Sequence, residues 1–488
     1  MTKTALLVAP FLFATVACGG SKSGEGAKAP QASASAAKPK KLVVSKQAKK
    51  EHSEALKKFA AEDQKSQQWD EATCNRVAKE FIDASKQQEG DVGKALPSAL
   101  YNAGVAYLRC GKTEAARTQF LASYKADRNF HRGRAQVALF EYQKDGDLEG
   151  AIATLEKIIR DARFQDVNAL VSVAALQMER GNQVATSDGE NDLERAKKNI
   201  QRALAIDDSY MPASNQLAIY YLEVAKANAG QRKSRRRQLV VAGAKRQRVN
   251  QQQLELAALV AAQAIQKDSN YAPIHNTAGL IQAQMDNFNG AVKSFAKARA
   301  LDPKFFEAHM NYAAVNLSFR GFQQAADAYE SAIGLQPRDY EAHLGLALAY
   351  RGAIDDANFD EYVAKSQKHL DECKKISAAR AEAYYNEAIL TQEFRAKASG
   401  DAVKSIPTLR EAIKKYQAFI TRAGSKPEYA EAVKVSRARV KETNEIIDFV
   451  EEGEKLRKEQ EATNAKLRAE EAAADGDKSG ATSPPAAK

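Results

Sequence analysis

Two stretches of this chain carry the same spacing of small and aromatic residues. The segments 291–303 and 325–337 align with an offset of 34 residues. Their matching positions are Ala291, Phe295, Ala298 and Pro303 in the first segment and Ala325, Tyr329, Ala332 and Pro337 in the second. Apolar residues at this spacing predict one face of an α-helix, which ends before the proline. A period of this length is typical of stacked helical hairpins, a repeat architecture.

Further copies of this pattern extend over most of the chain, from 97 to 426. The clearest copy, at 97–130, places Gly104, Ala116 and Phe120 where closely packed helices need a small or a large side chain. This pattern resembles the tetratricopeptide repeat (TPR). The resemblance implies an all-α, TPR-type solenoid of helical hairpins that binds other proteins. Insertions interrupt the repeats near 183–192, 225–250, 353–362 and 394–407.

The sequence predicts two helical regions and two disordered tails outside the repeats. Residues 51–96 have the pattern of one more helical pair, and 427–472 are expected to form capping and charged helices. Residues 19–50 form a basic tether rich in Gly, Ser, Ala, Pro and Lys, and 473–488 form a polar tail. Segments of this composition cannot bury enough apolar surface to fold, so we expect both to be disordered.

The first residues have the layout of a secretory signal peptide. Lys3 precedes an apolar stretch that is too short to span a membrane. Residues 1–18 resemble the signal and lipobox of bacterial lipoproteins, in which Cys18 would receive the lipid. Thr15 stands where a lipobox usually carries Leu, so a signal cleaved without lipidation is the alternative. Gly19, and not Asp, follows Cys18, which resembles lipoproteins sent to the outer membrane. We therefore expect the chain to be anchored in the outer membrane, facing the periplasm.

The formal net charge of +11 is not spread evenly. The insertion at 225–250 contains many basic residues, among them Arg235, Arg236 and Arg237, and no acidic residue between Lys226 and Asn250. One interpretation is a solvated loop without a partner. Another is a site for an acidic protein, an anionic lipid or a cell-wall polymer. Nucleic acid is disfavoured because no aromatic residues are interleaved and the signal peptide directs the chain to the envelope.

Three histidines recur with the repeat, at His275, His309 and His343. A metal-binding or pH-sensing column would require their rings to converge. Neighbouring helix axes lie about 8–10 Å apart, whereas zinc ligands lie about 2 Å from one ion. No Asp, Glu or Cys recurs beside them at ligand spacing. We therefore expect partly buried structural rings and no metal site.

Neither the cysteines nor any sequence motif indicates catalysis. Cys74 and Cys110 are expected at the same edge of adjacent hairpins, where they form either a disulfide or two buried free thiols. Phosphate-binding glycine loops and the HExxH, GxSxG and CxxC motifs are missing from the sequence. We expect neither an enzymatic activity nor a cofactor.

The resemblance also implies where a partner would bind. In TPR proteins the ligand lies along the concave face formed by the first helix of each hairpin. The residues expected on that face include Tyr101, Phe140, Asn215, Asn276, Met310, Leu344 and Tyr385. Apolar side chains with scattered amides would suit a peptide or a helix in a groove. The alternative is that these side chains simply pack between neighbouring helices.

Signal, basic tether and repeat body together predict a non-enzymatic scaffold for envelope proteins. This layout is similar to that of the TPR lipoproteins of δ-proteobacterial envelope complexes, which include the gliding motility apparatus of myxobacteria. The alternative is an assembly factor for an outer-membrane protein, a pilus or a secretion complex. A cell-wall enzyme or its regulator would need an acid–base constellation that the sequence does not offer.

Overall fold

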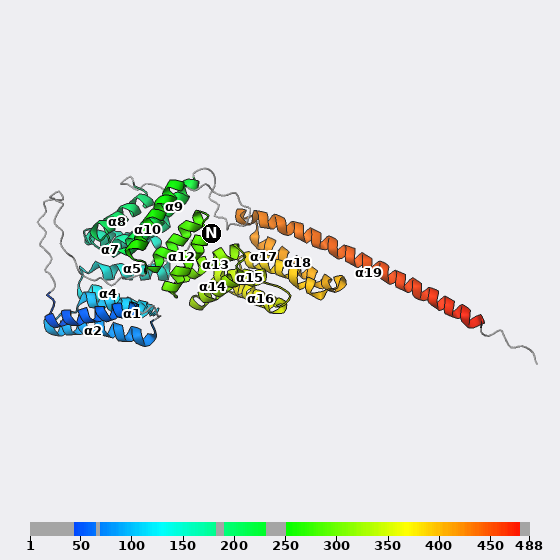
Figure 1. Ribbon diagram of the computed structural model, residues 1–488, viewed down its shortest axis with the longest axis horizontal. Coiled ribbons are helices and arrows are strands. Elements are labelled where there is room, and N and C mark those ends of the chain that lie inside the picture. The colour runs from blue at the N-terminus through cyan, green and yellow to red at the C-terminus, as the bar shows by residue number, and fades with distance from the viewer. Residues whose placement is uncertain (1–42, 65–68, 182–189, 231–249, 479–488) are drawn as a thin grey trace, which may run out of the picture. The chain divides into compact units, whose positions relative to one another are not determined.

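The structure is a computed structural model that describes residues 43–64, 69–181, 190–230 and 250–478. Every regular element in these ranges is a helix (Figure 1). The chain divides into two compact units, and the boundary falls inside α13 (Phe306–Ser318), between Tyr312 and Ala313. The prediction of an all-α fold built from helical hairpins is confirmed. None of the described helices combines the length and the apolar character that crossing a membrane requires.

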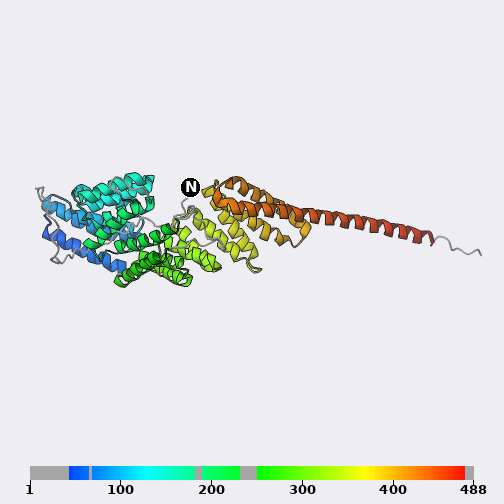
Figure 2. The same cartoon turned by 90° about the horizontal axis from the view of Figure 1, so that it is seen from above.

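The first unit is a succession of hairpins in which each helix packs against the next (Figure 2). Its helices before α13 are α1 (Lys46–Gln64), α2 (Glu71–Val92), α3 (Pro97–Leu108), α4 (Thr113–Ala126), α5 (His131–Asp145), α6 (Leu148–Asp161), α7 (Val167–Arg180), α8 (Asp192–Ile206), α9 (Met211–Gly230), α10 (Gln251–Lys267), α11 (Ala272–Gln284) and α12 (Phe288–Leu301). Alternate helices also touch, so that α5, α7, α9 and α11 line one side of the unit.

The second unit continues the hairpins and then departs from them. Its elements after α13 are α14 (Phe322–Leu335), α15 (Tyr340–Gly352), α16 (Phe359–Ile376), α17 (Glu382–Leu390), the π-helical turn η1 (Thr391–Arg395), the 3₁₀ turn η2 (Lys397–Ser399), α18 (Ala402–Ala423), η3 (Pro427–Tyr429) and α19 (Ala430–Lys478). The last helix packs against α18 and extends well beyond it (Figure 1).

A glycine facing an aromatic ring explains part of the repeat pattern. A Cβ on Gly104 of α3 would come within 2.7 Å of the Phe120 ring on α4. The equivalent pair in a later hairpin is Gly279 and Phe295, where the distance would be 2.5 Å. Both distances are too short for a real side chain, so only glycine lets the two helices approach this closely. The spacing of small and large residues therefore sets the packing within these hairpins.

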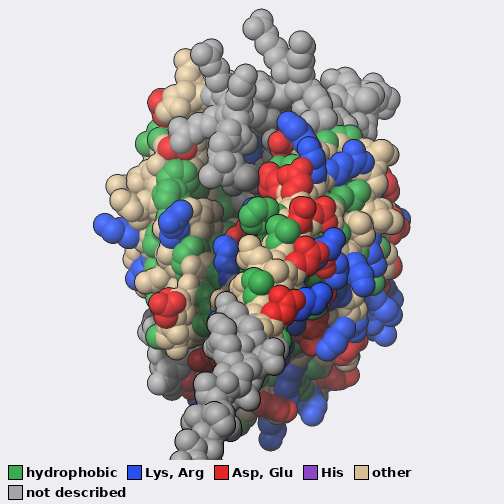
Figure 3. Space-filling view, turned by 90° about the vertical axis from the view of Figure 1, so that its right-hand side faces the viewer, with side chains coloured by type: hydrophobic (Ala, Val, Ile, Leu, Met, Phe, Trp, Pro, Cys, Tyr) green, Lys and Arg blue, Asp and Glu red, His purple; other side chains and the backbone are tan. Residues whose placement is uncertain are grey.

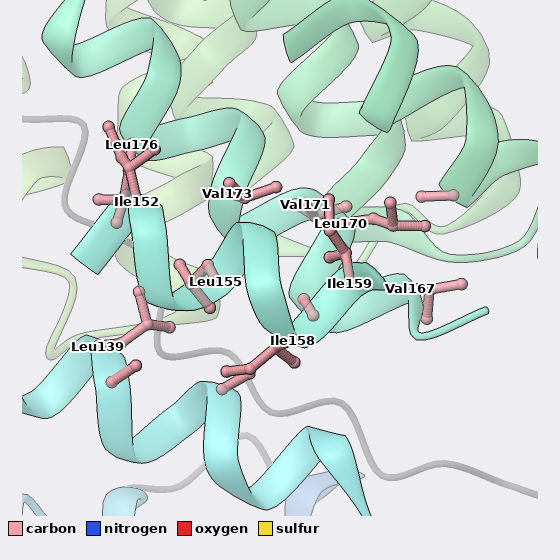
Figure 4. Close-up of a cluster of buried hydrophobic side chains, with 14 of the residues drawn as sticks. Leu139, Ile152, Leu155, Ile158, Ile159, Val167, Leu170, Val171, Val173 and Leu176 are labelled. Atoms are coloured by element: carbon pink, nitrogen blue, oxygen red, sulfur yellow. The ribbon is translucent and has the colours of Figure 1, made fainter. Parts of the chain in front are cut away.

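The core consists of aliphatic side chains contributed by consecutive helices. Figure 4 shows Leu139 from α5, Leu155 and Ile158 from α6, and Leu170 and Leu176 from α7 meeting in one cluster. Each of these side chains is at most 2% exposed. Burying a side chain of this size stabilises a fold by about 1.5–3 kcal/mol. Stability is therefore distributed along the unit, from one hairpin to the next.

Helix boundaries differ from the predicted regions at both ends of the fold. Helix α1 begins at Lys46, inside the segment 19–50 expected to be a tether. One continuous helix, α19, replaces the expected capping and charged helices of 427–472 and runs on to Lys478. Helix α19 therefore extends into the segment 473–488 that was expected to form a disordered tail. No proline interrupts this stretch, and Arg457 pairs with Glu454 and Glu461 one turn away on either side, which supports a long exposed helix.

The two helices that flank the basic insertion, α9 and α10, are joined by a hydrogen bond. The backbone N–H of Asn250, just before α10, donates to the carbonyl of Ala225 in α9 at 3.2 Å. The side chain of Asn250 also accepts from the N–H of Gln253 and caps α10. The hairpin therefore closes in spite of the insertion. Residues 231–249, which include Arg235, Arg236 and Arg237, lie outside the described residues, as does Cys18.

Candidate functional site

The first helices of the hairpins in the first unit are joined by side-chain hydrogen bonds. The Asn311 amide of α13 donates to Asn276 of α11 at 2.9 Å. The hydroxyl of Thr277 donates to Asn215 of α9 at 2.7 Å. Tyr210, just before α9, donates to Asn168 of α7. Because a buried amide must be hydrogen-bonded, these pairs fix the register of neighbouring helices.

Aromatic rings fill the space beside this amide series in the first hairpins. The Tyr101 ring lies 5.1 Å from the Phe120 ring and 5.8 Å from the Phe130 ring, and Phe140 stacks on Phe120 at 5.9 Å. Tyr101 is 1% exposed and Phe140 is 4% exposed. Burial raises the pKa of the Tyr101 hydroxyl far above its ordinary value, so it stays neutral. This inner face is packed core.

The residues predicted to line a concave groove are therefore mostly inaccessible. Five of the seven predicted side chains are buried, namely Tyr101, Phe140, Asn215, Asn276 and Leu344. The prediction that they project into an open groove is wrong, because neighbouring helices cover them. Met310 and Tyr385 are half-buried, and the Tyr385 ring packs 5.0 Å from Phe419. The alternative interpretation, that such residues pack between helices, describes these positions better.

The three periodic histidines occupy equivalent places. In each, Nε2 lies within hydrogen-bond distance of the carbonyl six residues earlier: Ser269 for His275 (2.9 Å), Pro303 for His309 (2.9 Å) and Pro337 for His343 (3.1 Å). The imidazole N–H thus satisfies a carbonyl of the turn that precedes its helix. Among the described residues, no three His, Cys, Asp or Glu side chains are grouped so that they could hold a metal ion.

A fourth histidine joins the last of this series. Nδ1 of His343 lies 2.9 Å from Nδ1 of His369 on α16. Because Nε2 of His343 donates to Pro337, its Nδ1 accepts, and His369 is the donor. Burial, followed by the neighbouring His343, lowers the pKa of His369 to about 4. Both rings are thus engaged in hydrogen bonds within the fold.

Cys74 and Cys110 form a disulfide in the structure. Their Cα atoms lie 6.4 Å apart, and the bridge links α2 to the end of α3 across 36 residues. Of the two alternatives that the sequence left open, the structure contains the bridge. Cys373 is a buried free thiol whose pKa burial raises to about 12, so it is neither a thiolate nor accessible.

A cluster of charged side chains lies where two distant parts of the first unit meet. Arg109 donates to Asp63 of α1 at 2.7 Å, and Lys304 Nζ reaches the Arg109 carbonyl at 3.5 Å from 195 residues away. Burial raises the pKa of Asp63 and of the nearby Asp302. Glu307 at the start of α13 is 7% exposed, and burial raises its pKa to about 7. The sequence offered no signal for this cluster, because its members share no spacing.

Large exposed apolar side chains gather on α19. They are Phe449 (79% exposed), Leu456 (55%), Leu467 (51%), Ile446 (50%) and Val435 (36%). On another side of α19, facing α18, a groove of about 580 Å³ lies between the start of α18 and the middle of α19, with Val403, Ile406 and Ala462 in its lining. Seen from the end toward which α19 extends, acidic and basic side chains interleave with hydrophobic ones (Figure 3). The exposed side chains of α19 form an accessible surface, which is the candidate binding site.

The sequence predicted 451–472 as a charged helix and did not identify this surface. A signal was present, because Ile446, Phe449 and Leu456 follow one another at spacings of three and seven residues. Such spacing is that of the apolar positions in a heptad. It was obscured by the Lys, Arg and Glu residues around it.

Comparisons with known proteins found one repeat profile and several solved structures with partial similarity. A tetratricopeptide-repeat family profile matches residues 97–130. No curated protein shows a significant match. A thermophilic TPR protein from Thermus thermophilus is 22% identical, with 45% of this chain and 98% of that chain covered and a TM-score of 0.36.

Two further solved structures give similar values. A tetratricopeptide repeat protein from Parabacteroides merdae is 14% identical, with 63% of this chain and 98% of that chain covered and a TM-score of 0.35. PilW, a type IV pilus biogenesis factor, is 15% identical, with 55% and 98% covered and a TM-score of 0.38. These values concern the fold alone. The chain is thus similar to TPR proteins, and its segment 97–130 matches the repeat that defines them.

Proposed function

We propose that this chain is a non-enzymatic scaffold that binds other proteins of the cell envelope. Cys18 anchors it by lipid to the outer membrane, with the repeats facing the periplasm. Its place is in a multiprotein envelope machine of the gliding-motility type. The order of signal, lysine-rich tether and repeat body along the chain supports this assignment.

The distribution of exposed apolar surface carries the proposal. The inner face of the first unit is packed and hydrogen-bonded, whereas α19 exposes five large apolar side chains along its length and lines a groove with α18 on another side. Exposed apolar side chains gathered in one region, with charged residues around them, are typical of protein-binding surfaces. We therefore assign partner binding to α18 and α19.

Three features that could suggest catalysis, namely the His343–His369 pair, Cys373 and the groove between α18 and α19, do not support it. The His343–His369 pair is hydrogen-bonded to a turn carbonyl, and Cys373 is a buried thiol. The groove beside α19 is lined by Lys and Glu side chains such as Glu454, whose pKa Arg457 lowers to about 2. A general acid or base needs a pKa near the working pH, which this carboxylate does not have.

The proposal is tested by capturing neighbours in intact cells. Cells that express the tagged full chain are treated with a crosslinker, and captured proteins are compared with those from Cys18→Ala and from Leu456→Ser. We expect a defined set of envelope proteins with the wild type. The set should be lost with Cys18→Ala, because the chain is no longer held at the membrane. It should be reduced with Leu456→Ser, because this substitution removes apolar contact area.

Leu259→Ser is the matched control, since Leu259 on α10 is 54% exposed and lies outside α18 and α19. This variant should retain the full set of partners. Capture of no envelope protein by the wild type would refute the scaffold proposal. Capture of unfolded outer-membrane proteins or pilin subunits in place of a stable set would instead indicate an assembly factor.

A further inference from the structure

Helix α19 has two apolar faces, and the described residues cover only one of them. Val440, Ile447 and Val450 pack against Ile406 and Ile413 of α18. The exposed stripe formed by Val435, Ile446, Phe449, Leu456 and Leu467 lies about 130° away around the helix. A helix that needs to bury one face only has no use for a second apolar stripe. The second stripe therefore indicates a packing partner other than α18.

The stripe follows the a and d positions of a heptad. With Ile446 at position a, Phe449 is at d, Leu456 at d, Leu467 at a and Val435 at d. All five residues thus fall on the two positions that form the seam of a coiled coil. These five residues span 33 residues, roughly 50 Å of helix, and the other a and d positions in this span are Arg439, Glu442, Gly453, Gln460 and Thr463.

Gly453 occupies an a position between Phe449 and Leu456. A Cβ placed on it would meet no atom within 4 Å, so nothing within the described chain requires a glycine there. A glycine inside a helix costs about 1 kcal/mol relative to alanine. A large side chain of another chain, packed against α19 at this level, would explain the glycine, because only glycine leaves room for such a side chain at close approach.

We propose that the partner of the exposed stripe is a second copy of the chain, an inference that rests on the assignment of partner binding to α19. Helix α19 of one copy pairs with α19 of the second copy as an antiparallel coiled coil, centred at the level of Glu451. In this register Val435 lies opposite Leu467 of the second copy, and Ile446 lies opposite Leu456. Phe449 lies opposite Gly453 and fills the space beside it. Each of the five exposed apolar residues then meets an apolar residue or the glycine.

A parallel pairing would match these residues less well. Phe449 would face its own equivalent, and Gly453 would face glycine and leave a gap, which costs packing energy. The antiparallel pair also leaves α18 free, because α18 packs on the opposite side of α19 in each copy. Gln460 lies opposite Glu442, where the amide can donate to the carboxylate.

Charges along the edge of the stripe oppose this pairing. Glu452 would lie beside Glu452 of the second copy, and Glu445 beside Glu459. Like charges at such positions weaken association and are screened by salt. A self-paired helix therefore associates more strongly as salt rises. A basic partner helix would show the reverse dependence. The salt dependence of association therefore distinguishes a second copy of α19 from a basic partner helix.

The first test measures the mass of the full chain with Cys18→Ala, which removes the lipid, by sedimentation from about 1 to about 100 µM protein. We expect a monomer–dimer equilibrium that strengthens at higher salt. Leu456→Ser should raise the dissociation constant at least about tenfold. Leu259→Ser, at nearly equal exposure, should leave it unchanged. A monomer at every concentration would overturn the proposal.

Two substitutions probe the register. Gly453→Leu improves the helix propensity of an isolated α19 but fills the space assigned to Phe449, so it should abolish dimerisation while helicity by circular dichroism stays the same or rises. Glu452→Gln removes like-charge repulsion, so it should lower the dissociation constant several-fold and weaken its salt dependence. Unchanged association in Gly453→Leu, or weaker association in Glu452→Gln, would contradict this pairing.

Cysteine crosslinking determines the direction of the helices. Copies with Ile446→Cys are mixed with differently tagged copies with Leu456→Cys, in the Cys18→Ala chain. The antiparallel pairing predicts a disulfide between the two kinds of chain. Disulfides only between copies of the same kind would indicate a parallel pair and overturn the proposed register. The chain without an introduced cysteine is the control, since Cys373 is buried and Cys74 is bridged to Cys110.

Discussion

The inner face of the first unit and the outer stripe of α19 have a similar sequence pattern and opposite exposure. Both consist of apolar residues at helical spacing, with amides among them. On the inner face Tyr101 and Asn276 are at most 4% exposed, because the next helix covers them. On α19, Phe449 is 79% exposed, because α18 lies on another side. Periodicity thus identifies an apolar face, whereas the number of neighbouring helices decides whether it is free to bind.

The largest expected difference between the two regions is in stability. Phe120→Ala should lower the free energy of unfolding of the first hairpins by about 3–5 kcal/mol, since Phe120 is fully buried and its loss leaves a cavity. Phe449→Ala should change stability by no more than about 0.5 kcal/mol. Trp69, the only tryptophan, lies in the same cluster as Phe120, so its fluorescence during urea unfolding reports on that cluster.

Equal effects of the two alanine substitutions would break the comparison. A large loss with Phe449→Ala would mean that α19 is covered within one chain. A small loss with Phe120→Ala would mean that the first hairpins tolerate a cavity in their core. Because repeat proteins can unfold in steps, the comparison uses the midpoint of the Trp69 transition and not that of the whole chain.

For the first unit, the sequence predicted the helical hairpins correctly but not which residues are accessible for binding. Gly104 and Phe120 identify a hairpin because close packing requires this pair wherever the repeat occurs. The same logic does not tell whether Asn215 or Asn276 faces solvent. That depends on whether the first helix of the neighbouring hairpin covers the residue. Charged clusters such as Asp63, Arg109 and Lys304 join residues far apart in sequence and leave no periodic signal.

The second region was predicted as a helix but not as a surface. Lys, Arg and Glu dominate 451–472, and one apolar residue every seven or eleven positions is inconspicuous among them. The meaning of Leu456 becomes clear only when α18 is seen to occupy the other side of α19. Positions outside the described residues, such as Arg235 and Cys18, stay predictions from the sequence.

The stability cost of replacing an asparagine should also differ between the two regions, by a smaller amount than for the two phenylalanines. Asn276→Ala removes the acceptor of the Asn311 amide inside the fold and should cost about 1–3 kcal/mol. Asn464→Ala, at an exposed position of α19, should cost no more than about 0.5 kcal/mol. Hydrogen exchange of α11 and α13 measures the effect locally. Unchanged protection in Asn276→Ala would restore this residue as a candidate for an exposed groove.

The last expected effect depends on pH and concerns two glutamates whose pKa values are shifted in opposite directions. Burial, with a lesser contribution from Asp302, raises the pKa of Glu307 from 4.5 to about 7. The hydrogen bond from Arg457 lowers the pKa of Glu454 on α19 to about 2. The folded chain therefore holds a proton on Glu307 that the unfolded chain releases above pH 4.5. This contribution to stability is complete below pH 4.5 and is lost as pH rises through about 7.

Glu454 behaves in the opposite way, since its contribution is complete above pH 4.5 and is lost only as pH falls toward 2. Between about pH 5 and about pH 8, Glu307→Gln should therefore gain stability relative to the wild type as pH rises, whereas the difference for Glu454→Gln should stay small and constant. Melting temperatures of the three proteins across this range measure both differences. His369 is present in all three proteins, so any titration of its ring cancels. A difference for Glu307→Gln that does not grow with pH would show that this carboxyl is solvated, so that the start of α13 resembles the open surface of α19 and not the closed interior of the first unit.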